Sequence, residues 1–440
     1  MRSDLILGQE THRPCAARSF GENLVVCVCN TTYCDDIEPL GDLRLGQAVL
    51  YYSNQNSSRL EKSNLRQTAN RAAGSILLTL DSRTTYQKML GFGGAFTDAA
   101  GIVLQSLPKA MQDTILEGYY GPNAWMKTNG HMKGGGRLRG KEGGEYYQTW
   151  ANYFIRFFEE YHKNGVDFWG VTVQNEPTSG LNPDYAWQTM YFSAAMERDF
   201  IKNLLGPALK SSPYTKDIQL MINDDQRYNL PGWADTILND TEAAKYVAGI
   251  GVHWYEDIEV PASVLTTTHN RHPDFFILAT EACTGYLPGQ GKPILGSWSR
   301  AEEYVHDIIE DVSNWVVGWM DWNICLDMHG GPNWVKNFVD SPIIVNAEKQ
   351  EYYKQPMWYA LGHFSKFVRP NSYRIMSNFE STPPKGVKQL AFITPDEYRV
   401  VVIINTDSES HTVSINEATN AALFYNVILE PHSLATVIIG

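Results

Sequence analysis

The chain has 440 residues and a mass of 49.6 kDa, enough for a large core with one or two smaller modules. Its formal net charge is −13, and its 36 lysines and arginines form no long basic run, which excludes nucleic acid as an expected partner. Protonation of the 11 histidines would cancel most of that charge. The composition therefore fits an acidic compartment such as a lysosome-like lumen.

The cysteines gather near the start of the chain. Four of the six lie close together, a density that indicates two disulfides in a small module: Cys15, Cys27, Cys29 and Cys34. Zinc is the alternative, but Cys27-x-Cys29 is too tight for a zinc knuckle and no histidine pair follows at finger spacing, so we expect no metal site. Cys283 and Cys325 stand apart and are predicted to be free thiols.

Other features of the sequence also favour a secreted or lumenal chain. Three Asn-x-Ser/Thr sequons are candidate glycosylation sites, at Asn30, Asn56 and Asn239. The N-terminus carries no apolar core of signal-peptide length, and no apolar run reaches ~18 residues. We therefore expect no transmembrane segment, and we expect that a signal peptide, if there is one, lies outside this sequence or behind a misassigned start.

Two kinds of pattern predict the fold. Runs of β-branched residues separated by polar turns, at 75–80 and 387–440, predict a β-sandwich assembled from both ends of the chain. Between them, apolar strand-like runs alternate with helical patterns such as 145–162, which predicts an α/β fold with a parallel (β/α)8 barrel of the TIM type. These runs are residues 89–94, 167–174, 218–222, 248–254, 275–280 and 316–322.

The predicted barrel is short of strands, because eight are needed and six are found. Between the first two runs, the sequence offers a helix near 109–117 and a glycine-rich stretch at 118–144 that contains no credible strand. Two strand-helix units are therefore expected to be missing. We expect three domains: a disulfide-bonded module (1–38 with 324–355), a sandwich (41–88 with 372–440) and a barrel (89–323 with 356–371) that is incomplete between about 119 and 124.

Two of the predicted barrel strands end in a glutamate. Residues 170–177 read GVTVQNEP, so an apolar run stops at Glu176, and the run that begins at Phe275 stops at Glu281 in the same way. Alone, Asn-Glu-Pro could be a turn or a helix start with proline at the first helical position. The second glutamate in the same context favours a catalytic pair, because two carboxylates at strand ends are the minimum for glycoside hydrolysis.

Six motifs in this order closely resemble the glucosylceramidases of glycoside hydrolase family 30. They are FGGAFTDA (92–99), WMKTNG (125–130), NEP (175–177), HWY (253–255), EAC (281–283) and GPNWVKNFVDSP (331–342). The resemblance runs from about Arg13 to the C-terminus. It implies a retaining β-glucosidase that hydrolyses glucosylceramide to glucose and ceramide without a cofactor, with Glu176 as acid/base and Glu281 as nucleophile.

The resemblance also implies roles for other residues, although a packed or turn residue is the alternative at each position. It implies that Asn175 binds the sugar 2-hydroxyl, that His253 and Tyr255 line the site near the nucleophile, and that an aromatic residue lies at the aglycone entrance. Phe192 matches that aromatic residue at the entrance, and Trp322 and Asn337 match residues of the glucose site. The cysteine spacing implies pairing of Cys15 with Cys27 and of Cys29 with Cys34.

The chain departs from the family pattern at one place. The pattern stops after Tyr120 and resumes near Ala124, omitting the second and third barrel strands and, with them, an aspartate and a tryptophan that hold the glucose hydroxyls. Loss of two adjacent strands leaves two unpaired edges or forces a smaller closure. The chain is then an alternatively spliced or mispredicted product, or a degenerate paralogue that binds glycolipid or a partner without activity. Esterase or thiol chemistry through Cys283 is a weaker reading, since no histidine and acid accompany it.

The expected substrate is embedded in a bilayer, so a chain without a membrane span must work at the membrane surface. Two segments that follow the nucleophile, residues 286–288 and Trp298, are candidates to touch lipid or an activator. The resemblance implies a saposin-type activator, anionic lipids and a lysosomal lumen, with secretion as the alternative location.

Overall fold

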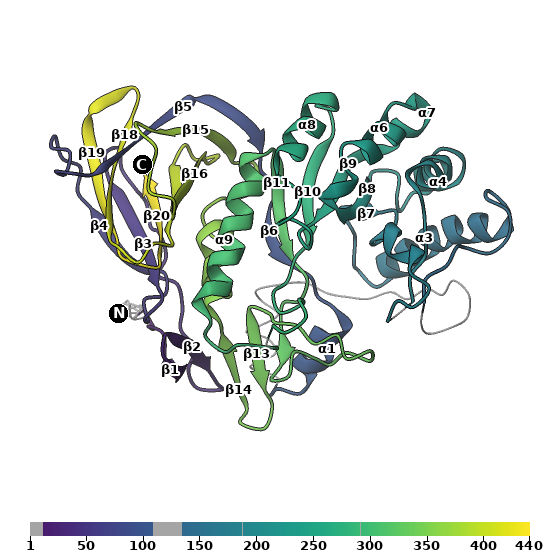
Figure 1. The fold of residues 1–440 in the computed structure, drawn as a ribbon, viewed down its shortest axis with the longest axis horizontal. Coiled ribbons are helices and arrows are strands. Elements are labelled where there is room, and N and C mark those ends of the chain that lie inside the picture. The colour runs from purple at the N-terminus through teal and green to yellow at the C-terminus, as the bar shows by residue number, and fades with distance from the viewer. Residues whose placement is uncertain (1–11, 109–133, 187, 291) are drawn as a thin grey trace, which may run out of the picture.

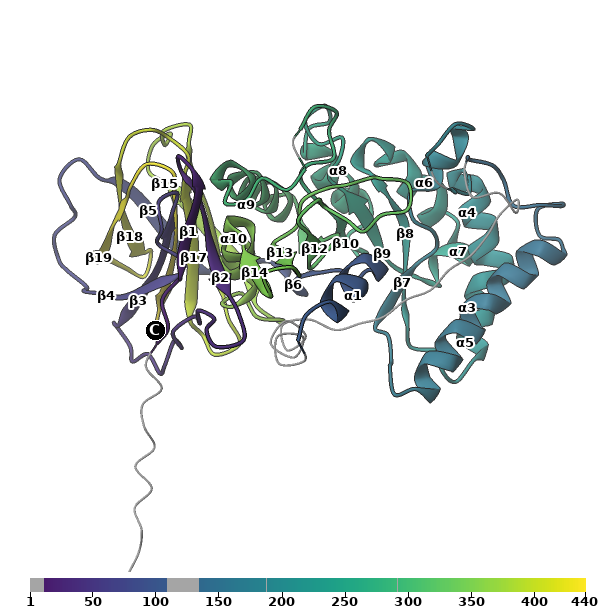
Figure 2. The same cartoon turned by 90° about the horizontal axis from the view of Figure 1, so that it is seen from below.

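The computed structural model describes residues 12–108, 134–186, 188–290 and 292–440. Within these ranges the strands form three sheets. Figures 1 and 2 show the largest sheet at one end of the molecule and helices α3 (Glu145–Lys163) and α4 (Ala194–Phe200) at the other end. The predicted helix at 109–117 and the expected break at 119–124 lie outside the described residues.

The β-sandwich is built from both ends of the chain, as predicted. Nine strands pair in the order β19-β18-β5-β15-β16-β17-β20-β3-β4, and aliphatic side chains fill the space between them. All neighbours are antiparallel except β18 and β5. The strands are β3 (Ala48–Asn54), β4 (Glu61–Leu65), β5 (Ile76–Lys88), β15 (Tyr373–Phe379), β16 (Val387–Ile393), β17 (Arg399–Asn405), β18 (His411–Glu417), β19 (Asn420–Leu429) and β20 (Ser433–Ile439).

The parallel sheet contains all six predicted barrel strands. Its order within the described ranges is β6-β11-β10-β9-β8-β7, so β6 and β7 are the end strands. Apolar side chains cover both faces of these strands, which explains their nearly continuous apolar runs. The strands are β6 (Gly91–Gly94), β7 (Gly170–Thr172), β8 (Gln219–Gln226), β9 (Val247–His253), β10 (Phe276–Glu281) and β11 (Val316–Asp321).

Helices follow the parallel strands and cover the sheet. The longest, α3 and α9 (Trp298–Ser313), place apolar residues at helical spacing against the core. Helix α9 contacts α10 (Pro356–Ser365), β11 and β16, so it joins the parallel sheet to the sandwich. The shorter helices are α1 (Asp98–Gln105), α5 (Gly206–Ser211), α6 (Gly232–Leu238), α7 (Thr241–Ala244) and α8 (Ser263–Arg271), and a π-helix covers Ile201–Leu205. No helix in the described part of the chain has the length and apolar character needed to cross a membrane.

The N-terminal module is a small sheet closed by disulfides. Cys15 pairs with Cys27 and Cys29 with Cys34, while Cys283 and Cys325 are buried free thiols. The sheet order is β1-β2-β14-β13-β12, from β1 (Ala17–Gly21), β2 (Leu24–Cys29), β12 (Leu326–Asp327), β13 (Ile343–Asn346) and β14 (Glu351–Lys354). Of the three sequon asparagines, Asn56 and Asn239 are exposed and Asn30 is half-buried.

Candidate active site

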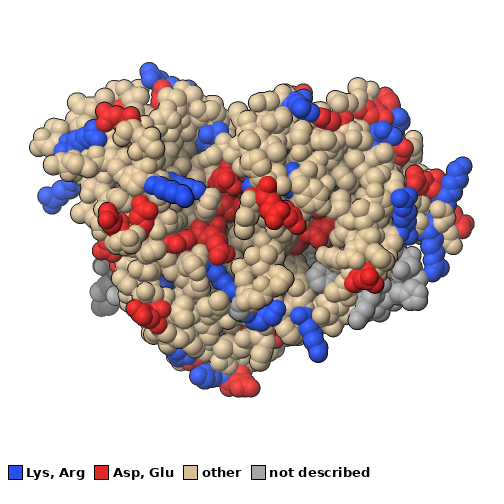
Figure 3. All heavy atoms as spheres, in the orientation of Figure 1, with Lys and Arg blue, Asp and Glu red and all other residues tan. Residues whose placement is uncertain are grey.

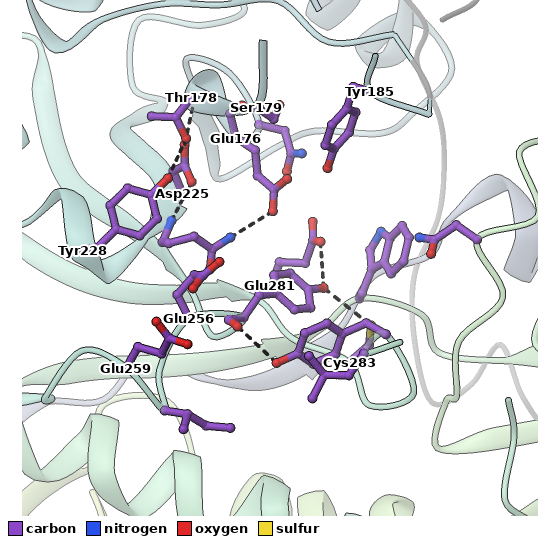
Figure 4. A pocket seen from close by; sticks show the side chains of 18 of the residues that line it. Glu176, Thr178, Ser179, Tyr185, Asp225, Tyr228, Glu256, Glu259, Glu281 and Cys283 are labelled. Atoms are coloured by element: carbon purple, nitrogen blue, oxygen red, sulfur yellow. Dashed lines mark hydrogen bonds between the residues drawn. The ribbon is translucent and has the colours of Figure 1, made fainter. Parts of the chain in front are cut away.

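Glu176 lies just beyond the end of β7 in an unusual backbone conformation. Its φ is 42°, in the left-handed region, which costs a non-glycine residue about 1–3 kcal/mol. Two contacts hold it there: its N–H donates to the Asp224 carbonyl (2.9 Å), and its own carbonyl accepts from the Ser179 N–H (3.0 Å). Pro177 then starts a short 3-10 helix (Pro177–Leu181). This turn directs the carboxyl away from the strand and into a cavity (Figure 4).

The end of β8 supports this carboxyl from behind. The register with β9 shifts between Asn223 and Asp225, and both Asn223 (φ 70°) and Asp224 (φ 51°) are left-handed. The irregularity aims the Asp224 carboxylate across the sheet, where it accepts 2.6 Å hydrogen bonds from Thr172 on β7 and Thr280 on β10. A β-bulge is a common device for redirecting a side chain beside an active site.

His253, at the end of β9, connects the two acids. Its Nδ1 lies 3.1 Å from Glu176 Oε1 and its Nε2 lies 3.2 Å from Asp224 Oδ1. Burial of the ring works against a positive charge, but the hydrogen bonds to Asp224 and Glu176 outweigh it, and the His253 pKa is raised well above its ordinary value. The imidazolium therefore donates from both nitrogens.

Glu281 ends β10 and is held by one tyrosine. The Tyr255 hydroxyl donates to Glu281 Oε1 (2.9 Å), and the Tyr286 hydroxyl donates to the Tyr255 carbonyl (3.1 Å). Burial raises the pKa of Glu281 to about 7. The positive charge of His253 and the Tyr255 hydrogen bond lower it, whereas the negative charge of Glu176 raises it.

The two glutamates face each other beside His253. A carboxylate oxygen from each and a ring nitrogen of His253 all lie within 4.8 Å of one another. By distance alone the three groups could hold a metal ion. However, the protonated imidazole that faces two carboxylates has no free lone pair to offer.

The glutamates line a cavity of about 1020 Å³. In Figure 4 their side chains point toward each other across it, and the Tyr185 hydroxyl points inward. Acidic side chains also gather along the middle of the molecular face shown in Figure 3. The walls carry Asp225, Gln226, Tyr228, Tyr255, Glu256, Glu259, Tyr286 and Trp322. Polar groups and aromatic rings converge here, as in sites that bind sugars by hydroxyl contacts and by the apolar ring face.

Most of the predicted site residues come together in this cavity. Six line it: Asn175, Glu176, Tyr255, Glu281, Trp322 and Asn337. His253 is 2% exposed and lies directly behind Glu176. Phe192 is not among the described lining residues. It is 1% exposed and packs in the core against Tyr147 and Phe200.

Reasoning from the sequence missed the contribution of β8. Gln226 Nε2 donates to Glu176 Oε1 (3.1 Å), and Asp224 anchors His253. The signal was present: the third predicted strand also ends in a polar run, Asn223-Asp224-Asp225-Gln226, at the same edge of the sheet as the two glutamates. Tyr185, another lining residue, lies in an irregular segment that carries no strand pattern.

Of the two segments expected to touch lipid or an activator, residues 286–288 reach the surface and Trp298 does not. Leu287 is 39% exposed at the mouth of the cavity, beside Ile258, which is 90% exposed. The expectation for Trp298 is wrong, since this residue is 6% exposed and its indole N–H donates to Glu302 (3.0 Å). It starts helix α9, whose apolar face is buried, and the sequence pattern could not separate this first helical residue from the loop before it.

Two glutamates with oxygens within 4.8 Å at the ends of parallel strands are the pair of carboxyl groups that glycoside hydrolases use. The sequence matches two protein-family models. Residues 120–368 match the glycosyl hydrolase family 30 TIM-barrel domain, and residues 371–437 match the glycosyl hydrolase family 30 beta sandwich domain. The chain belongs to glycoside hydrolase family 30 and is a glycosidase of that family.

Two curated relatives are similar over nearly their whole length. "Putative glucosylceramidase 4" of Caenorhabditis elegans is 44% identical and is aligned over 94% of this chain and 93% of its own length. The mouse lysosomal acid glucosylceramidase is 39% identical, over 92% of each chain. The first alignment spans 485 positions, more than this chain has residues, so it includes positions of the relative without a counterpart here. Among solved structures, SrfJ from Salmonella typhimurium has the same fold, with a TM-score of 0.78, 23% identity and coverage of 89% of this chain and 99% of its own.

Proposed function

We propose that this chain is a retaining β-glucosidase whose substrate is glucosylceramide. The observation that carries the proposal is the spacing of the glutamates, with oxygens within 4.8 Å. Retention needs carboxyls roughly 5–5.5 Å apart, whereas inversion needs roughly 6.5–9.5 Å so that a water fits between them. The substrate follows from the names of the relatives, which are glucosylceramidases over almost their whole length.

The proposed reaction has two displacements. In the first, Glu281 attacks the anomeric carbon while Glu176 gives its proton to the glycosidic oxygen, so that ceramide leaves as the alcohol and glucose stays bonded to Glu281. In the second, Glu176, now a carboxylate, takes a proton from a water molecule as that water attacks the anomeric carbon. Glu281 leaves as a carboxylate, and glucose is released with its original configuration.

The ionisation of Glu281 decides whether the site is reactive. Burial raises the pKa of Glu281 to about 7, so this carboxyl must lose its proton before it can attack. Only the form with the proton on Glu176 reacts. The Tyr255 hydroxyl supports that form, since it donates to Glu281 and stabilises its ionised state. The positive charge of His253 also stabilises ionised Glu281.

The other lining residues hold the sugar in this proposal. Asn175 binds the 2-hydroxyl, a contact that strengthens as the transition state becomes oxocarbenium-like. Trp322 offers its ring to the apolar face of glucose, and Asn337 accepts or donates a hydrogen bond at the opposite wall. Phe192 enters only as packing support, because it is buried in the core.

The rim of the cavity favours a lipid aglycone. Three apolar side chains that line the cavity remain exposed: Leu181 (64%), Ile258 (90%) and Leu287 (39%). We propose that this rim meets the membrane surface in the lysosomal lumen, with secretion as the alternative, and that anionic lipid and a saposin-type activator assist there. Anionic vesicles should then raise the activity of a competent form near pH 5, and indifference to them would reject work at an interface.

A second candidate is a glycolipid-binding relative that has lost activity. It is favoured by one observation: within the described ranges, the parallel sheet ends at β6 and β7. The stereochemical test separates the two candidates. NMR of the first product from a β-glucoside should show β-glucose for the proposed enzyme. An α-anomer would exclude retention, and no turnover beyond that of a Glu281→Gln variant would favour the binding protein.

A further inference from the structure

Helix α9 carries acidic side chains on its buried face, away from the proposed glucosidase site. Asp307 and Asp311 are 7% and 3% exposed, although most of their neighbours on that face are apolar. Asp257, from the loop after β9, reaches the same point. One carboxylate oxygen from each of the three lies within 4.8 Å of the others. Three carboxylates in such a space repel one another strongly.

The hydrogen bonds of this cluster are incomplete. Among the residues that the structure describes, none donates a hydrogen bond to Asp311 Oδ1 or to Asp257 Oδ1. Asp307 is the better satisfied, since its Oδ2 accepts from the Trp319 indole N–H (2.7 Å). The carboxyls of Asp257 and Asp307 are within hydrogen-bonding reach of each other, which is an arrangement that requires a proton or a cation between them. A buried carboxylate oxygen without a partner indicates a missing ligand.

Among the described residues, one arginine faces the cluster, and its single positive charge does not balance the negative charges of the carboxylates. Arg227 is 1% exposed; its Nη1 lies 2.8 Å from Asp257 Oδ2 and 3.8 Å from Asp311 Oδ1. Its Nη2 also pairs with Glu310 (3.3 Å). Its Nη2 and Nε donate to the backbone carbonyls of Asp257 (2.6 Å) and Val260 (2.7 Å), whereas Nη1 makes ion pairs but no hydrogen bond to the described residues. One positive charge thus faces four carboxylates, and burying the excess negative charge is costly.

We propose that Asp257, Asp307 and Asp311 form a binding site for Ca²⁺. Calcium takes 6–8 oxygen ligands at about 2.3–2.6 Å, so oxygens up to roughly 4.8 Å apart can share one ion. Mg²⁺ demands near-octahedral geometry and is usually held by one or two carboxylates with several waters, so three carboxylates suit Ca²⁺ better. The ion would use the oxygens that Arg227 leaves free, and it would replace the missing partner of Asp311.

The proposed calcium site borders a cavity that has room for water. A cavity of about 500 Å³ is lined by Asp257, Asp307 and Glu310, together with Trp254. Water from this cavity completes the coordination shell, as is usual for calcium. An ion here would tie α9 to the loop of residues 255–260, which also carries Tyr255 and Glu256 of the glucosidase cavity. The consequence is a more rigid wall for that cavity.

Terbium is a suitable probe, because it replaces Ca²⁺ and emits when a nearby tryptophan is excited. Trp254 and Trp319 both adjoin the cluster. The full chain is titrated with Tb³⁺ at pH 7, and the emission is then competed with Ca²⁺ and, separately, with Mg²⁺. Thermal unfolding is recorded with Ca²⁺ or with EDTA. Asp311→Asn is the test variant, and Asp274→Asn, at an exposed position on the turn before β10, is the matched control.

The expected results are Tb³⁺ emission that Ca²⁺ displaces more readily than Mg²⁺, and an unfolding midpoint that rises by a few degrees with Ca²⁺. Asp274→Asn should behave like the unaltered chain. Asp311→Asn should lose at least tenfold in Ca²⁺ affinity and should no longer respond to EDTA. The calcium proposal would be wrong if the two variants responded equally to Ca²⁺, or if the unaltered chain did not respond to millimolar Ca²⁺. A proton held between the carboxyls would then balance their charge. No readout depends on glucosidase activity, so the proposed function stands or falls separately.

Discussion

The β-sandwich sheet and the parallel sheet end in very different strands. At one end the sandwich sheet has β4, whose sequence Glu-Lys-Ser-Asn-Leu puts charged side chains at the edge, a known protection for an edge strand. At its other end is β19 (Asn420–Leu429), which is long and carries no charged side chain. The parallel sheet ends, within the described ranges, at β6 (Gly-Phe-Gly-Gly) and β7 (Gly-Val-Thr), which are short and uncharged. Charged side chains therefore protect one edge of the sandwich, the edge formed by β4. The end strands of the parallel sheet have the composition of strands that neighbours cover on both sides.

The proposed chemistry nevertheless lies on contiguous strands. Glu176, Asp224, His253 and Glu281 follow or end β7, β8, β9 and β10, which pair in sequence. The carboxylate network can thus form without a closed barrel. What a missing segment would remove is one side of the sugar pocket and the cover of β6 and β7. The comparison predicts a site with its reacting groups intact and its substrate poorly positioned.

The largest expected effect comes from removing a reacting carboxylate. The restored form is the chain with the segment that the family resemblance implies is missing inserted between Tyr120 and Ala124. As Glu281→Gln, this form should lose activity by roughly 10⁴-fold or more. Glu176→Gln should lose roughly 10²- to 10⁴-fold. Glu409→Gln, exposed on a sandwich loop, is the control and should keep full activity. Turnover of a fluorogenic β-glucoside measures all three, and an active Glu281→Gln variant would contradict the assignment.

Restoring the segment tests whether the end strands of the parallel sheet, β6 and β7, need to be covered by neighbours. The chain as given should unfold at a lower temperature than the restored form and turn over a β-glucoside about 10²-fold more slowly, because positioning is lost. Hydrogen exchange of the amides of β6 and β7 should slow on restoration, whereas that of β17 in the sandwich should not change. Equal thermal stability and equal turnover of the two forms would show that the end strands need no cover.

Tyr255→Phe should have an intermediate effect. The change removes the 2.9 Å hydrogen bond that stabilises ionised Glu281, so activity should fall roughly 10- to 100-fold. The bond lowers the pKa of Glu281, and its loss should raise that pKa above about 7. Glu281 reacts as the anion, so the acidic limb of the pH–rate profile should move to higher pH. An unshifted limb in the restored form would mean that Tyr255 acts only by packing.

The smallest effect concerns stability and pH. Burial raises the pKa of Glu197 to about 8, against hydrogen bonds from the Trp233 and Asn223 N–H groups. A raised folded-state pKa stabilises the protein fully below the ordinary value near 4.5, and this contribution is lost as pH rises through 8. The unfolding midpoint should therefore be higher at pH 5 than at pH 8. Glu197→Gln should reduce that difference in thermal scans, and an unchanged difference would assign it to other groups.

Much of this structure could be predicted from the sequence because burial leaves a simple pattern. Parallel strands covered on both faces read as apolar runs, and a polar residue that ends such a run lies at the active edge, as Glu176 and Glu281 do. The pattern does not encode departures from regular strands. Asp224 reaches His253 only through a bulge and a left-handed backbone, which no periodicity announces. Nor does it say which way an aromatic ring turns, so Phe192 was expected at the entrance and lies in the core.

The assignment of Glu281 as the nucleophile can be tested directly by trapping the covalent intermediate. A cyclitol epoxide that mimics a β-glucoside reacts with the attacking carboxylate and stays bound, so peptide mapping by mass spectrometry locates the modified residue. In the restored form the adduct should lie on Glu281, should be absent from Glu281→Gln, and should form in unaltered yield in Glu409→Gln. An adduct on Glu176 or on any other residue, with Glu281 unmodified, would contradict the account.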